Sequence, residues 1–183
     1  MKLLGLPASN SSQSINAKLV GLALDWTVGM LPSPPETEVL DLKAYEMPLY
    51  SSDREAAGGV PAEAQAFFDT IGAADALIMS FAEHNGSYTA AFKNTYDWAS
   101  RINAEVYQNK PVVMMATSPG QRGGAGVLET ASSAAPFFGA ELIGTFSLPS
   151  FYETFSAEDR TIADDQKAEE LRALLQRLVD RLA

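Results

Sequence analysis

Residues 2–16 read KLLGLPASNSSQSIN, a short apolar segment that runs directly into a loop rich in serine and asparagine. The segment 2–6 has the composition of a buried strand. Apolar residues at three- and four-residue steps from Leu19 to Met30 then indicate an amphipathic helix. The loop between them holds six Ser or Asn side chains, although a helix cap needs only one. Because free N–H groups at a helix start attract anions, this stretch predicts a phosphate site directly after the first strand.

Four more strands are expected further along the chain, in the apolar segments 38–42, 76–81, 112–117 and 142–148. Two of these segments, 76–81 and 112–117, are almost continuously apolar, which is typical of strands covered on both faces in a parallel sheet. Helices are predicted at residues 61–72, 89–100 and 124–138 and over the leucine repeat 171–182. The proline-containing stretches 32–35 and 48–61 are expected to be loops.

The alternation of strands and helices predicts an α/β fold with right-handed crossovers. Five strands favour a flavodoxin-like three-layer sandwich, whose five-stranded parallel sheet has the order 2-1-3-4-5. The chain has 183 residues, of which 46% are apolar, so we predict a single domain over residues 1–183.

Composition excludes several kinds of site. The chain has no cysteine and one histidine, which excludes disulfides, a cysteine nucleophile and a multi-histidine metal centre, and no metal is predicted. A formal net charge of −10 disfavours nucleic acid or an anionic membrane as partner. No apolar run reaches the roughly eighteen residues of a membrane span, and the N-terminal segment is too short for a signal peptide. We therefore expect a soluble, cytoplasmic protein.

Two further loops share the edge of the sheet where a ligand is expected. In an open α/β sheet, ligands lie outside the carboxyl ends of the strands, at the point where the strand order reverses. The loop 82–88 contains Asn-Gly, which serves either as a simple surface turn or as a platform for a flat ligand. Its histidine, His84, is either a general acid or a surface or packing residue. The loop 117–125 is rich in glycine, which provides either flexibility or close backbone contact with a ligand.

The predicted helix 89–100 carries Lys93, Asn94, Asp97 and Trp98. Lys93 and Asp97 are spaced to pair along the helix. Trp98 belongs either to the core or to a subunit contact, and the core is favoured. The acidic pairs 164–165 and 169–170 are interpreted as a solvated helix face.

Four segments resemble the motifs of the NADPH-dependent FMN reductase family. Residues 8–16 (ASNSSQSIN) resemble GSxRxxSxN, 82–87 (AEHNGS) resemble PEYNGS, 93–98 (KNTYDW) match KNxxDW, and 118–124 (SPGQRGG) match SPGxxGG. The resemblance implies FMN as cofactor, NADPH or NADH as hydride donor, and a flavin, quinone or similar small molecule as electron acceptor. It also implies a homodimer or homotetramer, often packed through the helix that bears KNxxDW.

The resemblance also implies which residues form the FMN site. Those expected around the FMN phosphate are Ser9, Ser11, Ser14, Ile15 and Asn16. Those expected beside the isoalloxazine ring are Ala82, Glu83, His84, Asn85, Gly86, Ser118, Pro119 and Gly120. No catalytic side chain is assigned, because in such enzymes the cofactor supplies the chemistry.

Three positions depart from the family pattern. Ser11 stands where the family has arginine, Ala82 where it has proline, and His84 where it has tyrosine. Loss of the arginine removes a charged hydrogen bond, which predicts FMN binding that is weaker by roughly tenfold or more unless Arg122 or a residue of another subunit replaces it.

Two other functions compete with a reductase. A flavodoxin-like electron carrier or flavin-binding module would share the fold and the acidic composition without reacting with NAD(P)H. A serine hydrolase with His84 as base is disfavoured, because the chain lacks the GxSxG nucleophile elbow.

Overall fold

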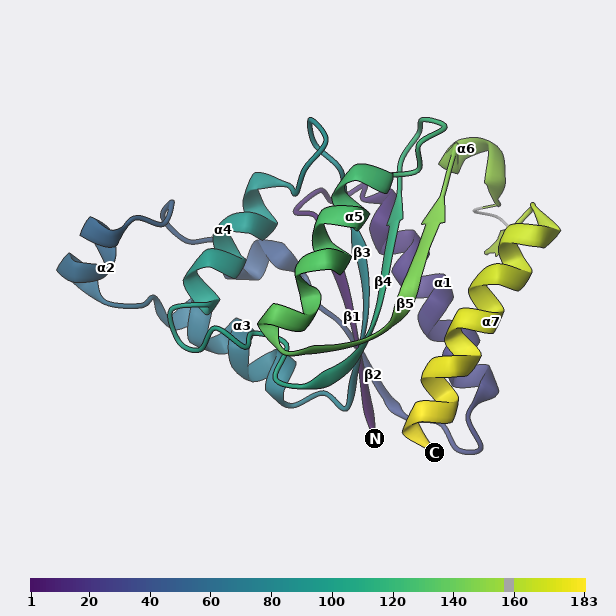
Figure 1. Ribbon diagram of the computed structural model, residues 1–183, viewed down its shortest axis with the longest axis horizontal. Helices are drawn as coiled ribbons and strands as arrows, with labels where there is room; N and C mark the ends of the chain where they lie inside the picture. Colours follow the sequence, from purple (N-terminus) through teal and green to yellow (C-terminus); the bar gives the residue numbers. More distant parts are fainter. Residues whose placement is uncertain (157–159) are drawn as a thin grey trace.

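A parallel sheet of five strands forms the middle layer of the protein, in a computed structural model that describes residues 1–156 and 160–183 (Figure 1). The strands are β1 (Lys2–Ala8), β2 (Glu36–Val39), β3 (Ala76–Phe81), β4 (Lys110–Thr117) and β5 (Ala140–Leu148). Their order is β2-β1-β3-β4-β5, and every neighbouring pair is parallel. The predicted flavodoxin-like topology is confirmed.

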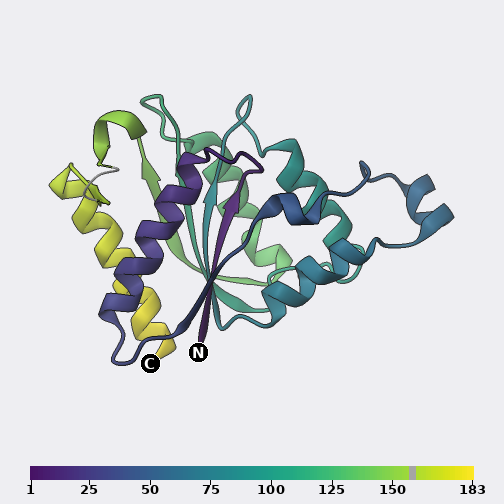
Figure 2. The same ribbon diagram turned by 180° about the vertical axis from the view of Figure 1, so that it is seen from behind.

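Helices cover both faces of this sheet (Figures 1 and 2). One face carries α1 (Ile15–Met30) and α7 (Asp165–Leu182), and the other carries α3 (Ala62–Gly72), α4 (Ala90–Ala99) and α5 (Ala125–Ala134). Successive side chains of a strand point to opposite faces, so the apolar strands supply two separate cores. The near-continuous apolar runs of β3 and β4 are buried throughout, as predicted.

Local signals place most helix ends where the sequence predicts them. Ser14 caps α1 by accepting a hydrogen bond from the N–H of Ala17, and Thr89 caps α4 through the N–H of Phe92. Helix α3 ends at Gly72, and Pro61, expected in its first turn, is its N-cap.

The second strand lies two to three residues earlier than the predicted segment 38–42. Strand β2 ends at Val39, and Leu42–Tyr45 form the short 3-10 helix η1. The reason is Asp41, whose carboxylate accepts the N–H of Lys43 and stabilises a turn in place of another pair of the sheet ladder. Strand β2 is an edge strand, where the exposed Glu36 and the partly buried Glu38 are well tolerated.

Two other predictions need correction. The stretch 48–61 is not only loop, because it contains the helix α2 (Ser52–Gly58), whose N-cap Ser51 accepts the N–H of Arg54. The predicted helix 124–138 is α-helical only to Ala134 and then continues as the 3-10 helix η2 (Ala135–Phe138). Pro136 explains this change, because proline has no N–H for the α-helical ladder and its ring clashes with the carbonyl four residues earlier.

Small elements after β5 had no sequence prediction. The short helix α6 (Phe151–Thr154) is followed by a two-stranded antiparallel pair, β6 (Phe155–Ser156) and β7 (Thr161–Ile162). Within the described residues, no helix is both long and apolar enough to cross a membrane.

Candidate functional site

The carboxyl ends of β1, β3 and β4 surround a pocket of about 200 Å³. Ten of the thirteen predicted site residues line it: Ser9, Ser11, Ser14, Ile15, Asn16, Ala82, Glu83, His84, Ser118 and Pro119. The other three, Asn85, Gly86 and Gly120, lie in the same loops but outside the lining. The pocket is smaller than the usual range for cofactor sites, roughly 300–1,000 Å³, so it encloses part of a flavin-sized ligand.

The serine loop of this pocket is held by its own hydroxyl groups. The Oγ of Ser9 accepts the N–H of Ser11 at 3.2 Å, and the Oγ of Ser11 accepts the N–H of Gln13 at 3.2 Å. The Oγ of Ser14 accepts the N–H of Ala17 at 3.1 Å. Each hydroxyl oxygen therefore binds backbone, which leaves its proton available to a ligand.

Helix α1 begins at this loop with two unpaired N–H groups. Within the described chain, the N–H groups of Ile15 and Asn16 donate to no protein acceptor, whereas those of Ser14, Ala17 and Lys18 do. The positive end of the helix dipole adds to them. Such a helix start binds phosphate well, and the donors present fit the phosphate of FMN.

Cationic side chains are missing from the pocket. None of the described residues that line it is lysine or arginine, and Glu83 contributes a carboxylate. Arg122, the proposed replacement for the missing arginine, is not among the residues that line the pocket. Its guanidinium lies close to Gly126, at the start of α5. An anion bound here would therefore be held mainly by hydroxyl and backbone N–H groups.

Asn16 acts differently from the other residues of the serine loop. Its side chain is buried, and its Oδ1 accepts from Ser80 Oγ at 2.7 Å and from the N–H of Thr117 at 3.1 Å. Its Nδ2 donates to the carbonyl of Thr117 at 3.2 Å. Asn16 thus joins the first turn of α1 to β3 and to the end of β4, and its amide serves mainly to position the loops.

The loop after β3 forms a tight turn. His84 and Ser87 exchange two backbone hydrogen bonds, of 3.0 and 3.1 Å, around Asn85 and Gly86. Both central residues have positive φ, 53° and 78°, which is the geometry of a type I′ turn and explains the Asn-Gly pair. The turn is exposed and holds the backbone of residues 84–87 above the edge of the sheet.

Glu83 connects this turn to the loop after β4. Its Oε2 accepts the N–H of Val127, in the first turn of α5, at 2.8 Å. The N-cap of α5 is Gly124, at φ 77°, which has no side chain to cap the helix. The Glu83 carboxylate takes that place and benefits from the helix dipole. It therefore fixes the spacing between the two loops predicted to flank the isoalloxazine.

Replacement of Glu83 by alanine is expected to lower the free energy of unfolding by about 1 kcal/mol, as for other lost helix caps. It should also weaken FMN binding, because the two loops lose their connection. Urea denaturation and flavin titration measure the two effects. Glu83→Gln keeps an oxygen that can accept the Val127 N–H and should recover most of both losses. Equal losses in the two variants would show that the negative charge, rather than the hydrogen bond, matters.

Three lining residues were absent from the predicted set: Gln13, Thr117 and Tyr152. Gln13 and Thr117 lie within loops that had been singled out. Tyr152 lies in α6, after β5. The rule that ligands lie beyond the carboxyl ends of parallel strands could have indicated this loop, but its composition carries no phosphate signal.

The KNxxDW segment holds a neighbouring part of the chain. Asn94 accepts the N–H of Tyr50 at 2.8 Å and donates to the carbonyls of Met47 and Pro48 at 3.0 and 3.2 Å. Trp98 is 1% exposed, and its Nε1 donates to the carbonyl of Pro48 at 2.8 Å. The predicted Lys93–Asp97 pair is present at 2.6 Å. The motif therefore ties residues 47–50 to α4, and the preferred core assignment of Trp98 is confirmed.

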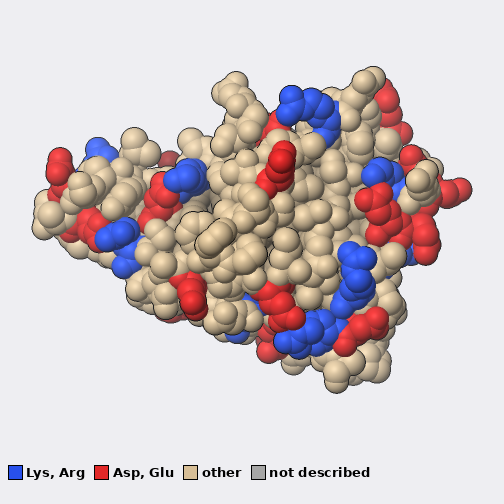
Figure 3. Space-filling view, in the orientation of Figure 1, with Lys and Arg blue, Asp and Glu red and all other residues tan. Residues whose placement is uncertain are grey.

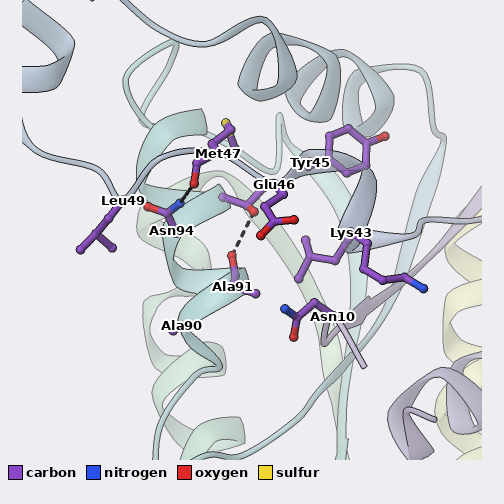
Figure 4. A pocket seen from close by; sticks show the side chains of 11 residues that line it. Asn10, Lys43, Tyr45, Glu46, Met47, Leu49, Ala90, Ala91 and Asn94 are labelled. Carbon is purple, nitrogen blue, oxygen red and sulfur yellow. Dashed lines mark hydrogen bonds between the residues drawn. The ribbon is translucent and has the colours of Figure 1, made fainter. Parts of the chain in front are cut away.

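This connection builds the wall of a second pocket, of about 260 Å³, shown in Figure 4. Its walls are the segment from Leu42 to Leu49 and the first turns of α4. In Figure 4, Asn94 joins Met47 across one end, and Asn10 of the serine loop lies at the other end. Asn10 is the only part of the serine loop that lines it. The predicted flavin residues therefore converge on the first pocket and not on this one.

The sheet order, with helices on both faces and a pocket at its switch point, defines the chain as a flavodoxin-like α/β protein. Residues 1–153 match the family model described as NADPH-dependent FMN reductase, and the chain belongs to this family. An NAD(P)H-dependent FMN reductase of Pseudomonas aeruginosa is 35% identical over 123 residues, which cover 67% of this chain and 63% of that protein. An NADPH:quinone oxidoreductase of Arabidopsis thaliana is 32% identical over 124 residues, 68% of this chain and 61% of that protein.

Solved structures agree with this placement. A flavoenzyme NAD(P)H:(acceptor) oxidoreductase of Paracoccus denitrificans superposes with a TM-score of 0.73 at 25% identity, over 98% of this chain and 95% of that one. A flavodoxin variant of Pseudomonas aeruginosa superposes with a TM-score of 0.56 at 16% identity, over 96% of this chain and 99% of that one, and supports the fold alone. The matched region spans a little over three fifths of the two curated relatives, 63% and 61% of their lengths.

Proposed function

We propose that the chain, as one domain, is an NAD(P)H-dependent FMN-binding oxidoreductase that passes electrons to a flavin, quinone or similar acceptor. The observation that carries the proposal is the pocket itself. Its hydroxyl groups and the two unpaired N–H groups of α1 fit a phosphate, and the turn after β3 lies beside it. Membership of the FMN reductase family and relatives named quinone reductases support the reaction and the acceptor class.

FMN, when bound, would supply the transfer of hydride and electrons from the nicotinamide to the acceptor. The protein's own part is to position the ring. Residues 82–86 and 118–120 are the predicted flanks of the isoalloxazine, and Glu83 and Asn16 fix the loops that contain them. Backbone N–H groups of these loops are the groups proposed to stabilise negative charge on the reduced ring. No side chain needs to act as a nucleophile.

The test separates a reductase from an electron carrier. The purified protein is reconstituted with FMN and mixed with excess NADPH, and then NADH, without oxygen. We expect rapid bleaching of the visible flavin band with at least one nucleotide, followed by recovery of the band when a quinone is added. A band that stays unchanged with both nucleotides would instead identify a flavodoxin-like carrier, and a protein that binds no flavin would contradict both functions.

A homodimer or homotetramer is part of the proposal. On the face over α4 and α5, scattered charged side chains are separated by uncharged surface (Figure 3). A hollow of about 170 Å³ between these helices is lined by the aromatic side chains Tyr88, Phe92, Tyr96, Tyr107 and Phe138 and also by Lys93 and Asp97. A second copy of the chain on this face would shield its apolar area from water. The molar mass measured by light scattering tests whether the protein is a dimer or a tetramer.

The predicted cytoplasmic location stays a prediction.

A further inference from the structure

Tyr152 is an exposed aromatic residue held firmly at the rim of the flavin pocket. Its side chain is 72% exposed, yet it lines the same cavity as Ser9, Ser11 and Ser14. The preceding residue, Phe151, is 2% exposed and stacks on Phe155 with ring centroids 4.6 Å apart. Because its neighbour anchors α6 in the core, Tyr152 is presented to the pocket by a fixed backbone.

Backbone hydrogen bonds fix α6 to the loop after β4. The N–H of Ser150 donates to the carbonyl of Gly120, and the N–H of Phe151 donates to the carbonyl of Ser118, both at 3.0 Å. The hydroxyl of Thr117 also donates to the carbonyl of Leu148, at 2.7 Å. The position of Tyr152 is therefore coupled to one of the loops that line the pocket.

Helix α6 packs on the face of the sheet that carries helix α1. Phe151 belongs to the core cluster between the sheet and helices α1 and α7, and Ile15, the first residue of α1, packs against the same cluster. Figures 1 and 2 show α6 and the start of α1 at the same edge of the sheet. The isoalloxazine-flanking turn after β3 is connected, through Glu83, to α5 on the opposite face. Tyr152 therefore lies on the same face of the sheet as the start of α1, and it shares the pocket lining with Ser11 and Ser14.

The pocket offers no cationic side chain to a bound phosphate among its described lining residues. A phosphate carries two negative charges near neutral pH, and no described lysine or arginine lines the cavity. The Tyr152 hydroxyl makes no hydrogen bond with the rest of the described chain. An O–H donor to an anion forms a strong, charge-assisted hydrogen bond without adding a charge of its own.

We propose that Tyr152 binds the phosphate of FMN, with its hydroxyl donating to a phosphate oxygen in place of the missing arginine. This inference rests on the proposed function and extends it by one binding residue. It commits the tyrosine to the phosphate end of the ligand and not to stacking on the isoalloxazine.

FMN and riboflavin distinguish these roles, because they differ only in the phosphate. Dissociation constants for both are measured by flavin fluorescence titration with the unmodified protein and with Tyr152→Phe. We expect the variant to bind FMN about tenfold more weakly and riboflavin unchanged. Tyr45→Phe is the matched control, because its hydroxyl pairs with Thr70 Oγ1, at 3.2 Å, outside the pocket. This control should leave both constants unchanged. Tyr152→Ala adds the loss of the ring.

Each other outcome overturns the inference in a recognisable way. FMN affinity that is equal in Tyr152→Phe and the unmodified protein would show that the hydroxyl does not bind phosphate. Tyr152→Phe with unchanged constants and Tyr152→Ala with equal losses for FMN and riboflavin would assign the ring to stacking on the isoalloxazine. An unmodified protein that binds neither flavin would contradict the proposed function together with this inference. Because Tyr152 is exposed, both variants are expected to fold.

Discussion

Replacing Trp98 by alanine is expected to lower the free energy of unfolding by about 3–5 kcal/mol, the usual cost of removing a fully buried large aromatic side chain. Trp98 is 1% exposed, its ring makes an edge contact with Tyr50 at 5.0 Å, and its Nε1 binds the carbonyl of Pro48. The substitution opens a cavity under residues 47–50 and leaves that carbonyl with only its longer hydrogen bond, of 3.2 Å, from Asn94. In a chain of this size the melting temperature should fall by roughly 10 °C, and urea denaturation and thermal melts measure both effects.

The chain's other tryptophan provides a matched control. Trp26 is only partly buried on α1, where the guanidinium of Arg172 lies 4.4 Å from its ring centroid. Trp26→Ala should therefore cost clearly less than Trp98→Ala. Trp98→Phe keeps most of the ring but loses the hydrogen bond to Pro48. Its loss of unfolding free energy should lie between those of Trp26→Ala and Trp98→Ala. Equal losses for Trp26→Ala and Trp98→Ala would contradict the role assigned to Trp98 in holding residues 47–50.

Asn16→Ala is expected to lower the free energy of unfolding by about 3 kcal/mol and to weaken FMN binding by at least about tenfold. Its amide oxygen accepts from both Ser80 and Thr117, and the Thr117 N–H would be left buried and unpaired. A buried donor without a partner costs about 1–3 kcal/mol, and a second lost bond adds to this. FMN binding should fall because the start of α1 is no longer fixed to the ends of β3 and β4. Urea denaturation and flavin titration test the two parts.

Asn10 is the control for this prediction. It lies in the same loop, is exposed, and makes no hydrogen bond through its side chain within the described chain. Asn10→Ala should change stability by less than about 0.5 kcal/mol. If Asn16→Ala lost FMN affinity at full stability, Asn16 would be a direct ligand of the phosphate. If it lost stability at full affinity, the serine loop would hold its shape without this connection.

Residues that signal structure locally could be predicted from the sequence. The alternation of five strands with helices predicted the sheet order, and the serine loop before α1 predicted the place of the candidate pocket. The Asn-Gly pair indicated the turn at residues 84–87. The wrong predictions concern places where a segment can form either of two local structures of similar stability. Asp41 stabilises a turn where another strand residue was expected, Ser51 caps a short helix within an expected loop, and Pro136 ends the α-helical ladder early.

The roles of individual side chains depended on contacts across the chain. Asn16 and Glu83 were predicted as ligand residues on the strength of a motif. The structure shows that Asn16 bonds to Thr117, 101 positions away, and that Glu83 bonds to Val127, 44 positions away. Tyr152 carried no signal at all, because its importance comes from the anchoring of Phe151 and the backbone bonds of α6.

Chain order and apolar periodicity were thus enough to specify the class of fold and the edge of the sheet where the candidate pocket lies. These features depend on the alternation of strands and helices, which is visible in each local segment of the sequence. They also depend on the right-handed connections that such units almost always have. Which polar groups remain available to a ligand was decided only by the tertiary structure. The sequence shows that a carboxylate, amide or hydroxyl is present but not whether it forms a hydrogen bond with a distant backbone group. Only the folded structure determines that partner.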